Sequence, residues 1–241
     1  MKVLVIIPAF NEEKSIGSVL QDIPASLVSE VVVVNNNSTD DTANVARSHG
    51  ATVLNEAEKG YGSACLTGIN YAKKLKPDLV VFLDGDYSDF PDELPILLDE
   101  IAAGRDLVIG SRMLGNSEPG ALLPQARLGN WLAVNLMRLF FGHRFTDLGP
   151  FRAIKWDKLI ALEMADKNFG WTVEMQIKAV RRGLRISEVP VSYRKRIGVS
   201  KVTGTFSGTI KAGSKILFMI FKYAVQKQKT HLNQVKGLRR T

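Results

Sequence analysis

The stretch Val80-Val81-Phe82-Leu83-Asp84-Gly85-Asp86-Tyr87-Ser88-Asp89 runs from four apolar residues directly into an acidic segment. The apolar run predicts a strand that is buried on both faces, as in a parallel sheet. In extended backbone, residues i and i+2 point to the same side, so Asp84 and Asp86 are expected to aim their carboxylates at one point. Gly85 between them allows a tight turn or the close approach of a ligand.

Two carboxylates at the end of a strand suit a hard divalent cation, Mg²⁺ or Mn²⁺, which is usually completed by water and phosphate oxygens. The alternative is that Asp84, Asp86 and Asp89 cap a helix beginning near Pro91. For an isolated Asp-x-Asp we would prefer this alternative. The position after a buried strand, together with the other polar strand ends described below, favours the metal site.

The composition predicts one large domain, or a domain with an appended tail, because 45% of the 241 residues are hydrophobic. The single cysteine, Cys65, excludes an internal disulfide and fits a reducing compartment. We see no signal peptide, and the apolar run 216–221 is too short to span a bilayer. The sequence therefore predicts a soluble or peripheral protein.

The net charge of +8 is concentrated near the C-terminus, where 16 Lys or Arg and one acid follow from Lys178 onward. Such a basic segment favours an anionic partner: membrane lipid, a phosphorylated substrate or nucleic acid. A solvated basic surface is the simpler alternative. Nucleic acid is the least favoured partner, because no aromatic residues interleave the basic ones.

Short strands and helices alternate along the first half of the chain, which predicts an open, mostly parallel α/β sheet. The expected strands are 2–7, 30–34, 51–54, 79–83 and 107–109. Ligands of such sheets bind outside the carboxyl ends of the strands. Polar segments follow all of these strands, at 8–12, 35–40, 59–62, 84–86 and 111–112.

Several enzyme classes are excluded by missing motifs. The first strand is not followed by Gly-x-Gly-x-x-Gly, and Cys65 stands where the third glycine after Gly60-Tyr61-Gly62 belongs. The chain contains no P-loop, no Ser-His-Asp grouping and no metal-spaced His/Cys cluster.

The second half predicts a loop over 113–124, a helix over 127–141 that is either buried or interfacial, and a basic loop over 194–201 able to wrap a diphosphate. A last helix, 207–229, carries a lysine stripe beside a broad apolar face. That pattern suits an anionic membrane surface, or packing on the body of the protein or on a second subunit. We therefore divide the chain into a domain over 1–205 and a basic helix with tail over 206–241.

Seven motifs together resemble the family 2 inverting glycosyltransferases of the GT-A fold, in particular the dolichyl- or polyprenyl-phosphate mannose and glucose synthases. They occur in the family's order: Ile7-Pro8-Ala9-Phe10-Asn11-Glu12-Glu13, Val34-Asn35-Asn36-Asn37-Ser38-Thr39-Asp40, Lys59-Gly60, Asp84-Gly85-Asp86, Gly110-Ser111-Arg112, Asp147 with Phe151-Arg152, and Arg196-x-Gly198-x-Ser200-Lys201.

The resemblance implies a nucleotide-sugar donor, Mg²⁺ or Mn²⁺, and transfer with inversion. It implies donor binding by Pro8, Phe10, Glu12, Asn36, Ser38, Lys59, Asp84, Arg112, Arg196, Ser200 and Lys201, and an acceptor phosphate near Arg127. Asp84, Asp86, Arg112 and Asp147 would form the catalytic set, and Asp84, Asp86 and Ser88 the metal ligands.

Two departures from the family pattern bear on specificity. An Asp pair of the family is Asn35-Asn36 here, which leaves the choice between a UDP and a GDP donor open, and Ser88 replaces a more usual Gln. A lipid phosphate acceptor is already ionised and needs no general base. A hydroxyl acceptor would need one, and Asp89 or Asp147 would be the candidates.

We therefore expect an enzyme, peripheral on the cytoplasmic face of a membrane, that moves a hexose to a polyprenyl or dolichyl phosphate. Transfer to a soluble or glycan hydroxyl, and a sugar-nucleotide-binding protein without catalysis, are the alternatives. A homo-oligomer is compatible with the apolar face of the last helix.

Overall fold

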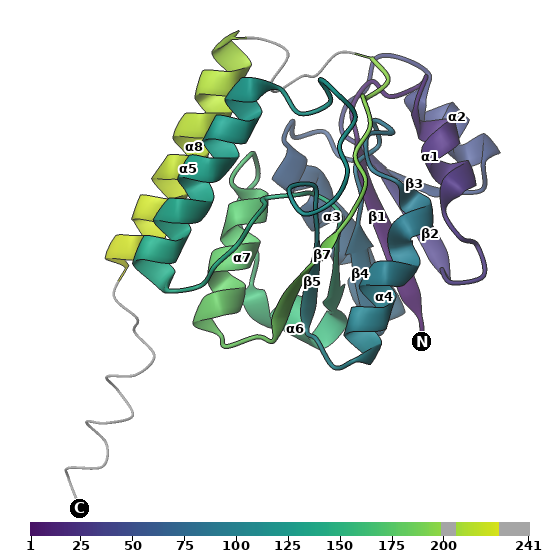
Figure 1. Ribbon diagram of the computed structural model, residues 1–241. Helices are drawn as coiled ribbons and strands as arrows, with labels where there is room; N and C mark the ends of the chain where they lie inside the picture. The colour runs from purple at the N-terminus through teal and green to yellow at the C-terminus, as the bar shows by residue number, and fades with distance from the viewer. Residues whose placement is uncertain (199–205, 227–241) are drawn as a thin grey trace, which may run out of the picture.

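The computed structural model describes residues 1–198 and 206–226, and shows one central sheet with helices on both faces (Figure 1). The strands are β1 (Val3–Ala9), β2 (Glu30–Asn35), β3 (Thr52–Asn55), β4 (Leu79–Phe82), β5 (Leu107–Ser111), β6 (Arg152–Lys155) and β7 (Ile186–Pro190). The helices are α1 (Ile16–Asp22), α2 (Thr42–Ser48), α3 (Tyr61–Leu75), the 3₁₀ turn η1 (Pro91–Glu93), α4 (Leu94–Ala102), α5 (Pro124–Phe141), α6 (Trp156–Leu162), α7 (Trp171–Arg181) and α8 (Phe206–Val225).

The seven strands lie in the order β3-β2-β1-β4-β6-β5-β7. All pairs are parallel except those of β6, which runs antiparallel to both β4 and β5. The prediction of an open, mostly parallel α/β sheet is therefore confirmed.

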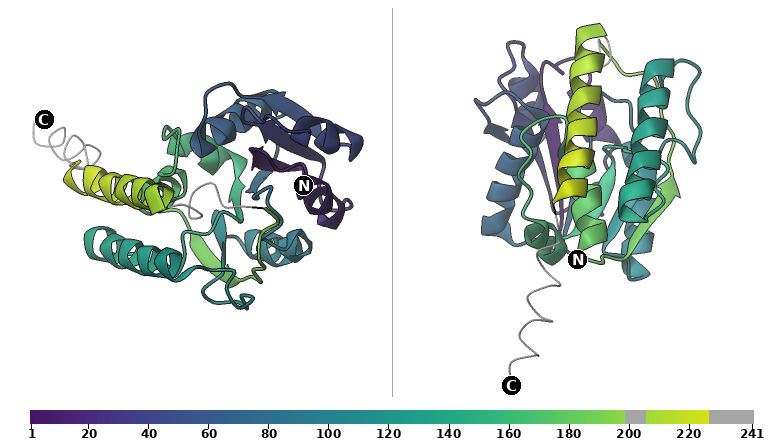
Figure 2. Two further views of the ribbon diagram at one scale, coloured as in Figure 1. Left: turned by 90° about the horizontal axis from the view of Figure 1, so that it is seen from above. Right: turned by 90° about the vertical axis from the view of Figure 1, so that its left-hand side faces the viewer.

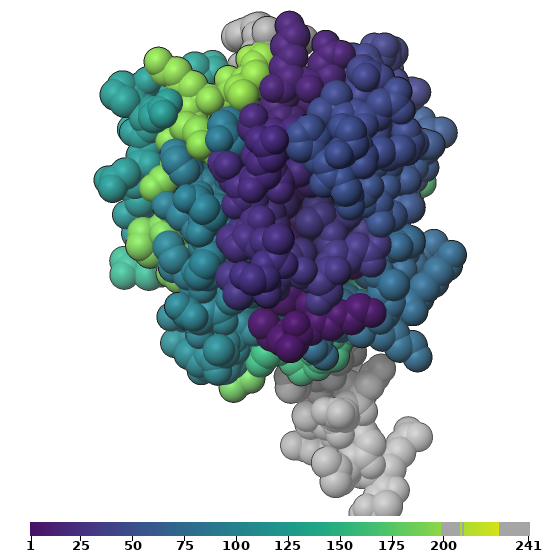
Figure 3. Space-filling view, turned by 90° about the vertical axis from the view of Figure 1, so that its right-hand side faces the viewer, coloured from purple at the N-terminus to yellow at the C-terminus, as the bar shows by residue number. Residues whose placement is uncertain are grey.

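Each central strand is buried on both faces because helices cover both sides of the sheet. In β1, Val3, Val5 and Ile7 pack in the same cluster as residues of α1, α2 and α4. The alternate residues Leu4 and Ile6 pack in a second cluster with α3, α6, α7 and α8. Figure 2 shows this second layer from two sides, and Figure 3 shows the side that the N-terminal segments cover.

The last helix packs on the body of the protein. Helix α8 lies beside α5 and contacts α7, and it buries Met219, Ile220 and Tyr223 (Figure 2). Other apolar residues of the same helix, among them Phe218 and Phe221, are exposed. The structure thus shows packing on the body of the protein, one of the alternatives that the sequence left open, and leaves part of the apolar surface of this helix exposed. In the described ranges 1–198 and 206–226, none of the helices has the length and apolar character needed to cross a bilayer.

The topology places a crevice at the carboxyl ends of β1 and β4. From β1 the chain continues outward through β2 and β3, and then returns through α3 to β4 on the other side of β1. Neighbouring strands whose connections leave in opposite directions separate the loops above them, and open α/β sheets bind ligands there.

Candidate active site

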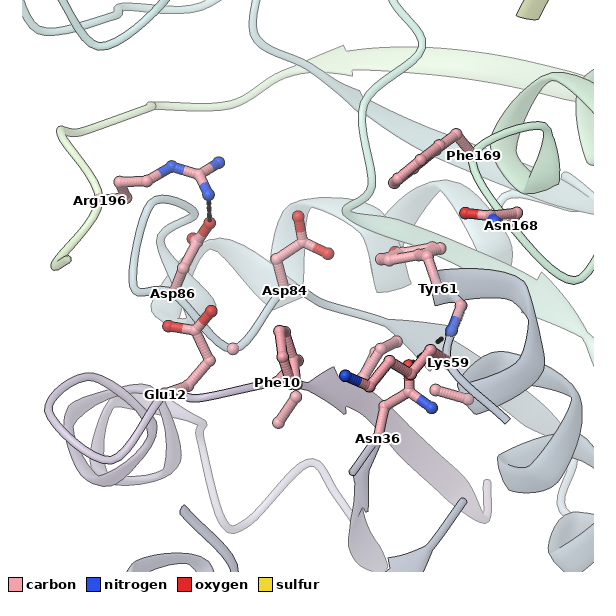
Figure 4. Close-up of a pocket in the computed structure, with 15 residues that line it drawn as sticks. Phe10, Glu12, Asn36, Lys59, Tyr61, Asp84, Asp86, Asn168, Phe169 and Arg196 are labelled. Atoms are coloured by element: carbon pink, nitrogen blue, oxygen red, sulfur yellow. Dashed lines mark hydrogen bonds and ion pairs between the residues drawn. The ribbon is translucent and has the colours of Figure 1, made fainter. Parts of the chain in front are cut away.

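A cavity of about 500 Å³ lies at the carboxyl ends of β1, β2 and β4 and at the start of α3 (Figure 4). It is lined by Pro8, Ala9, Phe10, Glu12, Asn36, Lys59, Gly60, Tyr61, Ala64, Asp84, Gly85, Asp86, Asn168, Phe169 and Arg196. Eight of the predicted site residues are in this lining: Pro8, Phe10, Glu12, Asn36, Lys59, Asp84, Asp86 and Arg196. The edge of the sheet at which the sequence placed the site is therefore the edge that carries the cavity.

The acidic pair is brought together by a turn. Strand β4 ends at Phe82, and Gly85 and Asp86 belong to a turn that continues into Tyr87 with φ of 64°. The expectation that extended backbone aligns the two carboxylates was therefore wrong, although both side chains do line the cavity. No side chain caps η1 or α4, so the alternative role of these acids in helix capping is not observed.

The electrostatics of the pair fit a divalent cation. Oδ1 of Asp84 is buried and has no hydrogen-bond partner in the described part of the chain. Burial, and then the charge of Asp86, raise the pKa of Asp84 to about 7. A cation between the two carboxylates would relieve both effects. Among the described residues no three His, Cys, Asp or Glu side chains cluster to hold a metal alone, so further ligands would have to come from substrate or water.

Arg196 is the cation placed against this pair. Its Nη1 lies 2.8 Å from Oδ2 of Asp86, and the next residue, Ile197, donates its N–H to the carbonyl of Asp86 at 3.0 Å (Figure 4). Asp86 also accepts hydrogen bonds from the N–H and hydroxyl of Ser88. The basic segment predicted at 194–201 therefore reaches the acidic turn, and its members Ser200 and Lys201 lie outside the described residues.

Asn36 lines the cavity, and its side-chain amide forms hydrogen bonds with backbone groups. Its amide nitrogen donates to the carbonyls of Glu56 and Glu58, at 3.2 and 2.7 Å, and its amide oxygen accepts the N–H of Gly60 at 2.8 Å. The side chain therefore supports the loop before α3 with both of its amide N–H groups, and its oxygen, which has two lone pairs, accepts one of these hydrogen bonds. Lys59 on that loop lies with its Nζ 5.5 Å from the ring centre of Phe10.

Asn168 and Phe169 were not predicted. They belong to the loop before α7, which passes so close to the start of α3 that a Cβ on Gly60 or Gly62 would collide with its backbone carbonyls. Asp166 organises this loop: Oδ1 accepts the N–H groups of Asn168 and Gly170, and Oδ2 binds Lys215 of α8 at 2.7 Å. The glycine pair was the signal available in the sequence, but it does not say which segment approaches.

A second cavity of about 170 Å³ adjoins the first, and the two share Tyr61, Asp84 and Phe169. Its remaining lining is Arg112, Leu148, Pro150, Trp171, Thr172, Ala212 and Ile216. Apolar side chains dominate this lining, which also includes one cation, Arg112, and one carboxylate, Asp84. Only Arg112 and Asp84 of these residues were predicted.

Arg112 is held in this cavity by Asp147. Nε and Nη2 of Arg112 bind the two carboxylate oxygens at 2.7 Å each, and the backbone N–H of Arg112 adds a third bond at 2.9 Å. Asp147 is fully buried and lines neither cavity, so its role in the described structure is to position Arg112. Burial and the charges of Asp84 and Asp86 raise the pKa of the other candidate base, Asp89, which also lines neither cavity.

Three further predicted residues lie outside both cavities. Ser88 is buried with its hydroxyl on Asp86, Ser38 accepts the backbone N–H of Asn11, and Arg127 is exposed on α5. In the described structure they do not contact the space in which a donor, acceptor or cation would bind.

Comparison with known proteins agrees with this architecture. The model of the glycosyl transferase family 2 matches residues 4–160. An uncharacterized glycosyltransferase of Mycobacterium tuberculosis is 39% identical over 215 residues, which cover 87% of this chain and 94% of the relative. An undecaprenyl-phosphate mannosyltransferase of Micrococcus luteus is 32% identical over 86% of this chain and 90% of its own.

Among solved structures, glucosyl-3-phosphoglycerate synthase of Mycobacterium tuberculosis in complex with Mn²⁺, uridine diphosphate and phosphoglyceric acid superimposes with a TM-score of 0.74. It is 21% identical, and the match covers 93% of this chain and 78% of the other. At this identity the likeness shows the shared GT-A fold. The family match and the relatives show more: this chain is a glycosyltransferase and belongs to glycosyl transferase family 2.

Proposed function

We propose that this enzyme transfers a hexose from a nucleotide sugar, UDP- or GDP-linked, to a polyprenyl or dolichyl phosphate at a membrane surface. The larger cavity would hold the donor and the smaller one the phosphate end of the acceptor. Asp84 lines both cavities and therefore lies where the two substrates would meet.

The observation that carries the choice of acceptor is the lining of the smaller cavity. Leu148, Pro150, Trp171 and Ile216 line it together with Arg112 and Asp84. A guanidinium locked by a carboxylate is suited to a phosphate, and the apolar walls are suited to the first isoprene units.

The positions of the two candidate bases, Asp89 and Asp147, support the same acceptor. Transfer to a hydroxyl requires removal of its proton, whereas a phosphate monoester is ionised near neutral pH. Both oxygens of Asp147 bind Arg112, and Asp89 is 2% exposed. Neither carboxylate can reach a hydroxyl in the smaller cavity without rearrangement.

On the donor side, Asp84 and Asp86 would hold Mg²⁺ or Mn²⁺. Bound there, the ion would supply positive charge to the departing diphosphate. Arg196 forms an ion pair with Asp86. When the divalent cation takes the place of Arg196 on Asp86, the guanidinium would be released to bind the diphosphate. The name of the Micrococcus luteus relative agrees with a polyprenyl phosphate acceptor, and such an acceptor would place the enzyme on the cytoplasmic face of a membrane.

The test is transfer of label from UDP- and GDP-hexoses, each with and without Mn²⁺, to polyprenyl phosphate that is then extracted into butanol. Phosphoglycerate and a simple glycan serve as competing soluble acceptors. We expect metal-dependent label in the lipid fraction from one of the two nucleotides. Label that appears only in a water-soluble product would contradict the proposed polyprenyl or dolichyl phosphate acceptor. Donor binding without any transfer would contradict the proposed hexose transfer itself.

A further inference from the structure

Helices α5 and α8 expose an unusual amount of apolar surface. Nine of the fifteen large hydrophobic side chains that are exposed in the described part of the chain lie on these two helices. We call them the α5–α8 face: Leu128, Trp131, Leu132, Leu139 and Phe140 on α5, and Ile210, Phe218, Phe221 and Val225 on α8. Trp131 is 60%, Leu139 73% and Val225 78% exposed.

The exposed residues form a strip along each helix. At about 100° per residue, Leu128, Trp131, Leu132 and Leu139 of α5 fall within an arc of about 100°, and Phe140 lies about 80° beyond that arc. The four side chains of α8 fall within about 80°. The helices lie side by side (Figures 1 and 2), and Phe140 meets Phe221 edge to face with ring centres 5.6 Å apart. The two strips therefore join into one surface.

Cations border this surface and acids are absent from it. Arg127 and Arg138 flank the strip on α5, and Lys211 and Lys222 flank the strip on α8; all four are exposed. Neither helix contains an Asp or Glu anywhere in its sequence. Tryptophan is enriched where a membrane meets water, and long basic side chains extend from such a surface to lipid headgroups.

We propose that the α5–α8 face docks flat on an anionic lipid bilayer. A second copy of the chain fits less well, because an isologous pairing of this face would bring its cations together with no acid to compensate. This assigns α5, and with it Arg127, to the membrane contact alongside the C-terminal helix. It rests on the proposed function in that a bilayer-embedded acceptor requires such a surface.

Docking of this face also explains how a lipid acceptor could reach the smaller cavity. Ala212 and Ile216 line that cavity from the inner side of α8, while Phe218 and Phe221 of the same helix face outward. One helix would therefore border both the bilayer and the smaller cavity. The path of an isoprene chain from the bilayer to this cavity would then be no longer than the width of α8.

The test is flotation of the full-length protein with vesicles of phosphatidylcholine and phosphatidylglycerol in equal amounts, and with pure phosphatidylcholine, in the absence of donor and acceptor. Wild type should float with the anionic vesicles. The double variant Trp131→Ser/Phe218→Ser should bind at least about tenfold more weakly, since two aromatic side chains no longer insert. Ile96→Ser, an exposed apolar residue on α4, is the matched control and should bind as wild type does.

Charge is tested separately with Arg138→Gln/Lys222→Gln, compared with Lys73→Gln/Lys74→Gln on α3. Only the first pair should weaken binding, and only at low salt. The proposal is overturned if wild type does not bind the anionic vesicles. It is equally overturned if both variants of the α5–α8 face bind these vesicles as wild type does, at low salt and at raised salt. It is also overturned if light scattering shows a dimer that Trp131→Ser/Phe218→Ser dissociates. Because no substrate is present, loss of docking and loss of transfer are separate results.

Discussion

Asp147 binds Arg112 through both of its carboxylate oxygens, and the same pattern recurs between Asp106 and Arg185. In each pair the backbone N–H of the arginine adds a third bond to the carboxylate. One pair stands at the smaller cavity, and the other joins the amino-terminal ends of β5 and β7. The chain thus offers an arginine at the proposed acceptor site and a structural arginine of matched geometry.

Arg112→Lys should lower kcat/KM for polyprenyl phosphate by about 10- to 100-fold, because an ammonium group keeps the charge but cannot form the paired bonds. Arg185→Lys is the control and should leave transfer unchanged. Steady-state kinetics with varied acceptor measure both variants. Equal activity of Arg112→Lys and wild type would show that Arg112 does not meet the acceptor.

Asp86→Asn should reduce metal-dependent transfer by about 100-fold or more, because it removes one of two proposed carboxylate ligands of the cation. Mn²⁺ binding, measured by electron paramagnetic resonance in the absence of substrates, should weaken in parallel. Circular dichroism should show an unchanged fold. Retained Mn²⁺ affinity would move the cation to another site.

Asp89→Asn should leave transfer within a few-fold of wild type. Both oxygens of Asp89 are buried without a partner in the described structure, and burial with the charges of Asp84 and Asp86 raises its pKa, so the neutral acid is favoured. An amide of the same shape should change the free energy of unfolding by less than about 1 kcal/mol. Loss of transfer in a folded Asp89→Asn protein would instead identify a general base.

Gly62→Ala should displace the loop before α7, because the new methyl group would collide with the carbonyl oxygen of Asp166. We expect the free energy of unfolding to fall by about 1–3 kcal/mol and nucleotide affinity to fall with it, since Phe169 leaves the cavity wall. Gly129→Ala on α5 is the control: its methyl group would meet nothing within 4 Å. It should stabilise the protein by about 0.5–1 kcal/mol. Urea unfolding and nucleotide titration measure both variants.

Asp106→Asn should reveal a pH-dependent contribution to stability. Hydrogen bonds from Arg185 lower the pKa of Asp106 below its usual value. A carboxyl whose pKa is lowered in the folded state stabilises the fold above its unfolded pKa, and this contribution is lost as the pH falls. The free energy of unfolding of wild type should therefore exceed that of the variant by about 1 kcal/mol near pH 7. This difference is modest because the Arg185 side chain is 61% exposed. The difference should shrink between about pH 4 and pH 2 in urea unfolding, and a constant difference would contradict the assignment.

The sheet and the donor side of the site could be predicted because they depend on local patterns. Buried apolar runs indicate central strands, and the ends of parallel strands must meet at one edge. Phe10 and Asp84 are far apart in the sequence but follow the adjacent strands β1 and β4, so their meeting in one cavity follows from topology.

Other parts of the site could not be predicted because they depend on contacts between distant segments. Phe169 reaches the cavity only because its loop packs on the start of α3. The sequence of the loop has no hydrophobic periodicity from which that contact could be predicted. Asn36 was expected to bind the donor, but the backbone groups that its amide also binds belong to a loop whose path the sequence does not disclose. Helix α8 is apolar on two sides, so its pattern could not say which side faces the body.

The ion pair between Lys215 and Asp166 ties α8 to the loop that carries Phe169, a residue that lines both cavities. Asp166 holds the backbone on each side of Phe169, so a displacement of α8 is passed to that ring within a few bonds. A nucleotide beneath Phe169 and a bilayer against α8 would then act on the same short segment from opposite sides. Thermodynamic reciprocity requires that, if either one tightens the segment, each strengthens the binding of the other by the same factor. Such an enzyme would hold its donor most firmly where its acceptor is found.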